Sequence, residues 1–182
     1  MADAIDTTNT ARLASADSPP CPARFREVMG SLAGTVAVVT ALGDRGQPLG
    51  MTVSSLTPVS QNPPLILFCP ALTSRTWPLL RAADGLCVSI LNEHQQDLSV
   101  QFAKAENRFA GVSWTLSPGG MPVLKGSIAW LECFVIDQHR AGDHEIVVAQ
   151  LRHIGTAGGA PLLRHRGRYT RIATPGTGVS SA

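Results

Sequence analysis

Most apolar residues of this chain fall in short runs that alternate with polar residues or are continuously apolar, as β-strands are. Gly, Pro, Asn and Asp separate these runs and form turns. The runs lie at residues 35–42, 49–56, 65–68, 86–91, 114–116, 127–137, 145–154 and 168–172. Large apolar side chains occupy both faces of the longest run, 127–137, at Trp130 and Phe134 and at Leu131 and Val135. We therefore expect it to be a central strand buried on both sides.

Other segments have the spacing of helices. Residues 23–32 place Phe25, Val28, Met29 and Leu32 on one side, which predicts an amphipathic helix with its apolar face toward the core. A short helix capped by Ser74 or Thr73 is expected to carry Trp77, Leu80 and Arg81, and a further helix is expected at 93–103. Residues 57–60 are predicted to continue the strand at 49–56, with a bend at Pro58.

Many short strands and only two or three helices favour a mainly β fold, an antiparallel barrel with peripheral helices. A doubly wound nucleotide-binding sheet is excluded because no G-x-G-x-x-G motif follows the first strand. The expected domain spans residues 23–172. Residues 1–22 are polar and Pro-rich, which predicts a flexible tail or arm, and residues 173–182 are expected to be a disordered tail.

Composition narrows the partners and the compartment. The formal net charge of the 182 residues is +2, too small to predict binding to nucleic acid or to an acidic membrane surface. No apolar stretch reaches the roughly 20 residues that span a bilayer, so we expect no membrane partner. The four cysteines are widely spaced, without a disulfide or zinc pattern, which favours the cytoplasm.

Three hydroxyls interrupt the strand at 49–56 and suggest a site. Thr52 and Ser54 share a face, with Ser55 beside them. The run at 65–68 is expected to bring Cys69 and Pro70, followed by Ser74, Arg75 and Thr76, to the same end of the sheet. An arginine with hydroxyls at a helix start suits a phosphate or a polyol. The alternative is that Thr and Ser merely tolerate a strand and that Ser74 only caps a helix.

Signatures of acid, base or nucleophilic catalysis are scarce. The chain has no G-x-S-x-G, H-E-x-x-H or Walker lysine motif. His144 alone among the five histidines lies in a Gly-Asp-His loop between two strong strands, and the alternative to a site role is a loop histidine paired with Asp143. An anion pocket with few reactive groups is typical of an enzyme whose cofactor supplies the chemistry.

Four motifs in order carry a family resemblance. These are G-M-T-V-S-S-L-T-P-V-S from Gly50, P-P-L-I-L-F-C-P from Pro63, S-R-T from Ser74, and Gly142-Asp143-His144. Over Phe25 to Ile172 the chain resembles the short-chain flavin reductases that serve two-component monooxygenases. The resemblance implies an FMN-binding split barrel that works as a homodimer.

The resemblance also assigns roles to residues. Flavin contacts would come from Met51, Thr52, Val53, Ser54, Ser55, Cys69, Pro70, Ser74, Arg75, Thr76, Phe102, Ala103, Lys104 and Tyr169. Within this set, the Ser74–Thr76 segment and Lys104 would bind the flavin phosphate. His144 would contact the nicotinamide or its carrier phosphates as the catalytic residue. One departure from the family pattern is Arg168, where an acidic or small residue is common.

The implied activity is NAD(P)H-dependent reduction of FMN or FAD, with release of reduced flavin to a separate flavin-dependent monooxygenase. The resemblance leaves open which flavin and which of NADH and NADPH are used. Two alternatives remain: an oxidase of the pyridoxamine phosphate type, and a non-catalytic module that binds flavin or haem.

Overall fold

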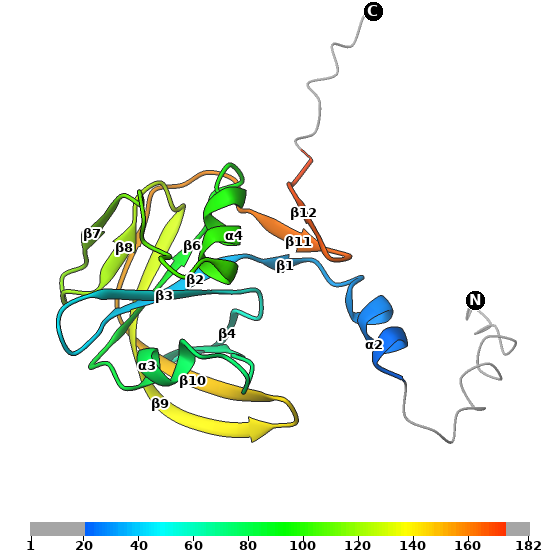
Figure 1. The fold of residues 1–182 in the computed structure, drawn as a ribbon, viewed down its shortest axis with the longest axis horizontal. Helices are drawn as coiled ribbons and strands as arrows, with labels where there is room; N and C mark the ends of the chain where they lie inside the picture. Colours follow the sequence, from blue (N-terminus) through cyan, green and yellow to red (C-terminus); the bar gives the residue numbers. More distant parts are fainter. Residues whose placement is uncertain (1–20, 174–182) are drawn as a thin grey trace, which may run out of the picture.

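The computed structural model of the chain describes residues 21–173 (Figure 1), so the predicted tails lie almost entirely outside the described residues. The described helices are α2 (Pro22–Met29), α3 (Trp77–Arg81) and α4 (Gln96–Lys104). The described strands are β1 (Gly34–Thr35), β2 (Ala37–Leu42), β3 (Pro48–Val53), β4 (Thr57–Gln61), β5 (Pro64–Phe68), β6 (Leu86–Ile90), β7 (Trp114–Leu116), β8 (Pro122–Leu124), β9 (Ala129–Ala141), β10 (His144–Thr156), β11 (Leu163–His165) and β12 (Arg168–Thr170).

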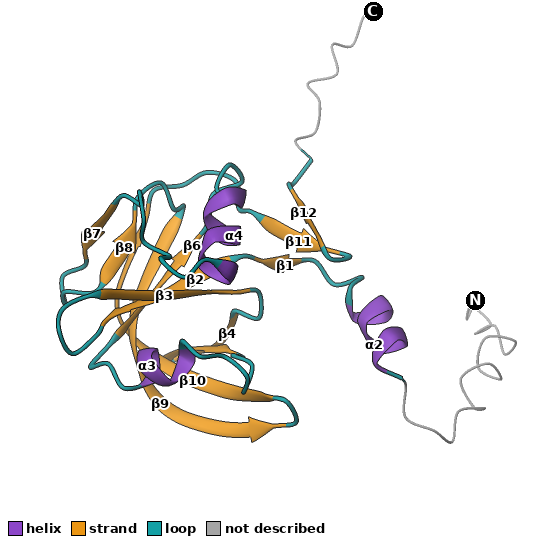
Figure 2. Cartoon of the chain, viewed as in Figure 1, coloured by secondary structure: helices purple, strands orange, loops and turns teal. Residues whose placement is uncertain are grey.

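One large antiparallel sheet dominates the fold (Figure 2). Its seven strands lie in the order β3-β2-β6-β9-β10-β5-β4, and a three-stranded sheet β1-β11-β12 and the hairpin β7-β8 complete the structure. The prediction of a mainly β, antiparallel fold with peripheral helices is confirmed. Strands β8 and β11, of three residues each, were not predicted.

The large sheet curls so that its two edges approach each other. Strands β3 and β4 follow one another in the chain, separated by Ser54–Leu56, but they are the opposite edges of the sheet. Four steps between successive Cα atoms reach at most about 15 Å, so the edges must meet near this connection. We call this place, residues 54–56 with the chain ends of β3 and β5, the seam.

Residues 57–60 are therefore not a continuation of the preceding strand, and that prediction is wrong. Strand β4 pairs with β5, with Thr57 opposite Leu67, at the far edge from β3. The chain bends at Ser54 rather than at Pro58, because β4 has its own hydrogen-bonding partner across the seam.

The hairpin β9–β10 is the longest element. Its turn is Gly142–Asp143, and Gly142 has a positive φ of 62°, which a glycine adopts without strain. β9 is central in the sheet, as predicted, but only Glu132 and Cys133 in it are fully buried. The expectation of burial on both faces is wrong: Leu131 and Val135 pack against the core, whereas Trp130 and Phe134 are only partly buried and belong to neither core cluster. The outer half of the hairpin extends beyond the body of the sheet (Figure 1).

Helix α2 differs from its prediction in its surroundings. It forms but ends at Met29, before the expected Leu32, and none of its residues is buried. Phe25 in the helix and Leu32 just after it are 55% and 65% exposed. The expectation that its apolar face packs on the core is wrong for a single chain. Figure 1 shows α2 standing outside the curled sheet.

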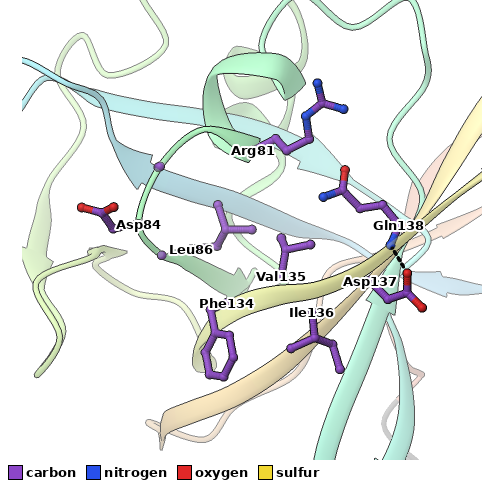
Figure 3. A pocket seen from close by; sticks show the side chains of 10 residues that line it. Arg81, Asp84, Leu86, Phe134, Val135, Ile136, Asp137 and Gln138 are labelled. Carbon is purple, nitrogen blue, oxygen red and sulfur yellow. Dashed lines mark hydrogen bonds between the residues drawn. The ribbon is translucent and has the colours of Figure 1, made fainter.

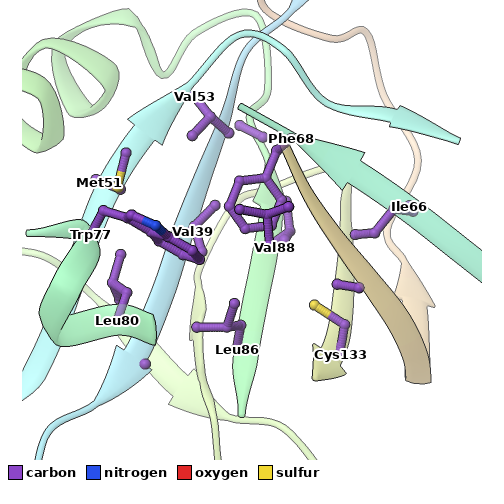
Figure 4. Packing of buried hydrophobic residues seen from close by; sticks show 14 residues of the cluster. Val39, Met51, Val53, Ile66, Phe68, Trp77, Leu80, Leu86, Val88 and Cys133 are labelled. Carbon is purple, nitrogen blue, oxygen red and sulfur yellow. The ribbon is translucent and has the colours of Figure 1, made fainter. Parts of the chain in front are cut away.

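Two apolar clusters fill the interior. The larger one joins β2, β3, β5, β6 and α3, with Phe68, Trp77 and Leu80 fully or almost fully buried (Figure 4). The smaller one surrounds Phe102 of α4, together with Leu91 and Leu162. Within residues 21–173, no helix has both the length and the apolar character needed to cross a membrane.

Candidate functional site

The seam brings the predicted hydroxyls and Cys69 together. Strand β3 ends just before Ser54 and Ser55, and β5 ends just before Cys69. The Cys69 amide donates a hydrogen bond to the Ser55 hydroxyl at 2.8 Å. The Ser54 side chain is exposed, and Pro70 is buried. The expectation that β3 and β5 deliver these residues to one place therefore agrees with the structure, although β3 and β5 are not adjacent strands.

The Thr52 hydroxyl points into the protein. It donates a hydrogen bond to the Ser99 carbonyl of α4 at 2.7 Å. The buried Ser99 hydroxyl in turn lies 3.0 Å from the Tyr169 hydroxyl of β12. Thr52 and Tyr169, which are far apart in sequence, are thus linked through one serine. This leaves Ser54, rather than Thr52, as the exposed hydroxyl at the seam.

Ser74 orders the entrance to α3. The amide of Trp77, the first residue of the helix, donates to the Ser74 hydroxyl at 3.1 Å, although the N-cap position itself is Thr76 rather than Ser74 or Thr73. The same hydroxyl lies 3.9 Å from the Met51 sulfur. Trp77 is followed by Pro78, whose missing N–H costs nothing in the first turn. Arg75 and Thr76 are therefore held at one end of a well-anchored helix.

Arg75 and Thr76 open into a cavity of about 560 Å³ between α3, β3 and the segment after α4. Three cationic side chains line it: Arg75, Lys104 and Arg108. We call it the cation cavity. Its other lining residues are Gln47, Pro48, Leu49, Gly50, Thr76, Leu79, Ala105, Glu106, Asn107 and Phe109.

Sequence reasoning missed Arg108. Its guanidinium donates to the Gly50 carbonyl at 2.8 Å, to the Ala105 carbonyl at 3.2 Å and to the Thr76 hydroxyl. Burial lowers the pKa of Arg108, and the nearby charge of Arg75 lowers it further. The only available signal was its position four residues after Lys104, which does not distinguish a site residue from a surface arginine.

The cation cavity fits an anion. No salt bridge to Arg75, Lys104 or Arg108 occurs in the part of the chain that the structure describes. A negative group bound beside Arg108 would offset the charge repulsion from Arg75 that lowers the pKa of Arg108. Guanidinium groups and hydroxyls are the donors that phosphate oxygens accept. The residues present therefore suit the phosphate of a nucleotide or flavin.

His144 lies at the tip of the β9–β10 hairpin, where its side chain is 46% exposed. Its Nδ1 lies 2.7 Å from the Asp143 carboxylate. The hydrogen bond to His144, followed by the charge interaction with it, lowers the pKa of Asp143. His144 lines neither the cation cavity nor a second hollow, which Ser54 and Ser55 line at the seam, so within one chain it is separate from both.

The remaining predicted contacts are mostly interior. Met51, Val53 and Phe102 are buried, and Ala103 is exposed. A Cβ added at Gly50 would lie 2.5 Å from the Phe102 ring, so α4 packs directly on the β3 backbone. Side chains buried in this way can meet a ligand only through their backbone groups.

Two further hollows are present. One, of about 380 Å³, lies at the seam and is lined by Ser54 and Ser55 with Leu32, Arg164 and Arg166 among others. Another, of about 410 Å³, lies between Arg81 at the end of α3 and residues 134–138 of β9 (Figure 3), and no predicted site residue lines it.

Comparison with known proteins gives consistent results. Residues 29–173 match the flavin reductase like domain. The reductase subunit HsaB of a flavin-dependent monooxygenase from Mycobacterium tuberculosis is 38% identical over 155 residues, covering 83% of this chain and 82% of that protein. The FMN reductase (NADH) SmoA of Agrobacterium fabrum is 35% identical over 149 residues, covering 82% of this chain and 85% of SmoA.

Solved structures agree. The NADH:FAD oxidoreductase SgcE6 of Streptomyces globisporus, solved with NAD and FAD fragments, superimposes with a TM-score of 0.79 at 31% identity, covering 88% of this chain and 98% of that one. The seven-stranded curled sheet is thus the split barrel that the motifs predicted. The chain belongs to the flavin reductase like domain family.

Proposed function

We propose that the protein catalyses NAD(P)H-dependent reduction of free FMN or FAD and supplies the reduced flavin to a separate monooxygenase. The observation that carries the proposal is the cation cavity, which offers three cations and the Thr76 hydroxyl to a flavin phosphate. The reductase subunits among the relatives support the monooxygenase partner. SmoA and SgcE6, both named for NADH, support NADH as the donor.

The flavin is proposed to lie along the seam. Arg75, Thr76 and Lys104 would hold its phosphate, and Arg108 would support Thr76 by the hydrogen bond between their side chains. Ser54 and Ser55, with the backbone around Thr52 and Val53, would bind the rest of the flavin, namely its ring and its polyol chain. Cys69 and Pro70 would border the flavin ring. The hydrogen bond from the Cys69 amide to the Ser55 hydroxyl holds Cys69 next to the proposed flavin contact Ser55.

When bound, the flavin supplies the acceptor for a hydride from the nicotinamide. The protein's task is to align the flavin and nicotinamide rings. This alignment speeds hydride transfer through proximity rather than through acid–base chemistry. His144 is proposed to bind the nicotinamide half or its phosphates, oriented by the Asp143 carboxylate at 2.7 Å. Tyr169 would fix the inner wall of the site through Ser99 and Thr52.

We also propose a homodimer. Phe25, Val28, Met29 and Leu32 form an exposed apolar stripe on and just after α2, larger than single scattered apolar residues. A second copy of the chain would cover this stripe. The cytoplasm is the proposed compartment, because widely spaced free thiols suit a reducing environment.

The test is spectrophotometric. Purified protein is mixed with NADH and either FMN or FAD, and absorbance at 340 nm is followed in air, with NADPH in a parallel set. Loss of NADH that depends on flavin supports the proposal, and the ratio of rates identifies the preferred flavin and donor. A protein that binds flavin without consuming NADH or NADPH would be a binding module instead, and the proposal would be abandoned.

A further inference from the structure

Two segments of the proposed site come from distant parts of the chain and are joined by backbone pairing. Residues 70–72, which follow β5, meet the tip of the β9–β10 hairpin. The Leu72 amide donates to the Asp143 carbonyl at 2.9 Å, and the Glu145 amide donates to the Pro70 carbonyl at 3.0 Å. Ala71 and His144 form an antiparallel bridge. The pairing ends at Leu72, before the chain reaches Arg75.

Beyond Leu72 a single side chain continues the connection. The Glu145 carboxylate accepts a hydrogen bond from the Trp77 indole N–H and lies 3.7 Å from the Arg81 guanidinium. These are the only side-chain hydrogen bond and ion pair between α3 and β10 in residues 21–173. The Glu145 side chain is only 14% exposed and Trp77 is buried, so the indole hydrogen bond is shielded from water, whereas Arg81 is half exposed and its ion pair contributes less.

The other end of this contact is rigid. Trp77 is 3% exposed and packs edge to face against Phe68 of β5, with ring centroids 5.5 Å apart. Its indole N–H cannot reach water and needs an acceptor, which Glu145 supplies. Trp77 also begins α3 directly after Arg75 and Thr76, while Glu145 directly follows His144.

We propose that Glu145 is a positioning residue: through Trp77 and Arg81 it fixes the spacing between Arg75 and Thr76 at the cation cavity and His144 on the hairpin. The inference rests on the proposed function, because it is the distance between a phosphate site and a nicotinamide site that would matter. Without Glu145, the backbone pairing would persist, but α3 and the hairpin tip would move relative to each other. Glu145 touches no ligand in this role.

Three variants separate positioning from stability. Glu145→Leu removes the acceptor and the charge at similar size, Glu145→Gln keeps an acceptor for the indole, and Trp77→Phe keeps the ring packing but removes the donor. Glu93→Gln is the matched control, since Glu93 forms a comparable 3.7 Å contact with Arg171 away from the proposed site.

We expect Glu145→Leu to raise the KM for NADH and the dissociation constant for FMN by about tenfold, the effect of one hydrogen bond to a charged group. Glu145→Gln should recover most of this loss and Glu93→Gln should show none. The double variant Glu145→Leu with Trp77→Phe should be no worse than Glu145→Leu alone, because both changes remove the same contact. A thermal midpoint that falls while KM and FMN affinity stay unchanged would show a merely structural role and overturn the proposal.

A second readout does not depend on turnover. In the flavin-free protein, amide hydrogen exchange of residues 73–76 should speed up in Glu145→Leu but not in Glu145→Gln, whereas exchange in β2 and β6 should not change. If the unaltered protein consumed no NADH, the proposed function would fail while this exchange experiment still tested the contact. Equal exchange at 73–76 in all variants would overturn the positioning role.

Discussion

Helices α2 and α3 both carry large apolar side chains at helical spacing, yet their environments are opposite. In α3, Trp77 and Leu80 are almost completely buried in the larger core cluster. In α2 no residue is buried, and Phe25 is more than half exposed. Periodicity therefore predicts a helix and its apolar side. Which partner covers that side depends on what the two ends of the helix are connected to.

The connections at each end explain the contrast. Helix α3 is tied to β10 by the hydrogen bond from the Trp77 indole to Glu145, and to β5 by the packing of Trp77 on Phe68. Helix α2 is tied to the barrel mainly at its end, where the Arg166 amide donates to the Gly30 carbonyl at 2.7 Å. An anchored helix stabilises the fold of one chain, and an unanchored apolar helix is available to another chain.

The largest expected effect is on α3. Trp77→Ala should lower the free energy of unfolding by about 3–5 kcal/mol, because a large buried ring and its packing against Phe68 are lost. Urea denaturation measures it. Leu79→Ala, which removes an exposed side chain of the same helix, should change the value by less than about 1 kcal/mol. Similar losses for the two variants would contradict the anchoring of α3 through Trp77.

The next effect concerns the residue that precedes α3. Arg75→Ala should weaken FMN binding by about 10- to 100-fold, because one charge-assisted contact to the phosphate is lost. Riboflavin, which has no phosphate, should lose little. Flavin fluorescence titration measures both, and Arg26→Ala on α2 serves as the control. If riboflavin and FMN lost affinity equally, the FMN phosphate would not bind in the cation cavity.

A smaller effect is expected on α2. Phe25→Asp should weaken self-association by about 1–2 kcal/mol, since an apolar contact becomes a charged one, with little change in the unfolding of the single chain. Light scattering after size exclusion, over a range of concentrations, measures the mass. Asp44, in the exposed turn before β3, offers a control in Asp44→Asn. A dimer of unchanged affinity would mean that α2 has no partner in a second copy.

His144→Ala should slow turnover more than it weakens flavin binding, by roughly tenfold or more in kcat, because the alignment of the nicotinamide is lost. Stopped-flow reduction at saturating NADH separates this step from binding. His139→Ala is a matched control, since His139 lies on the same hairpin and pairs with Asp137. Flavin affinity that falls as much as kcat would place His144 in the flavin site instead.

The smallest effect concerns Asp143, an exposed group within the anchored region. Its pKa is lowered by His144, so the pair stabilises the fold above the ordinary aspartate pKa of about 3.9 and is lost as the pH falls through the lower folded value. Asp143→Asn should therefore differ slightly from the unaltered protein at pH 5–7 and not at all near pH 2. Thermal unfolding across this range measures the difference, and a gap that widened in acid would contradict the assigned sign.

The sequence alone predicted most of the strands, the three helices and the family. Period-two runs and turn residues are local signals, so the β2–β3 and β9–β10 hairpins follow from them directly. The motifs from Gly50 to Thr76 similarly indicated one region as a candidate site. In the structure Ser55 is hydrogen-bonded to Cys69, and Arg75 and Lys104 line one cavity.

Other features were decided only by the tertiary structure. The seam exists because β3 pairs with β2 at one edge of the sheet and β4 pairs with β5 at the other edge. No local sequence pattern indicates which edge a strand joins. Arg108 reaches the site only because α4 packs on Gly50, and Glu145 reaches Trp77 only because β10 lies beside β5. Local periodicity indicates which side of a segment is apolar, whereas long-range pairing decides which segments meet and which apolar sides become buried, and the contacts of the proposed site depend on the second.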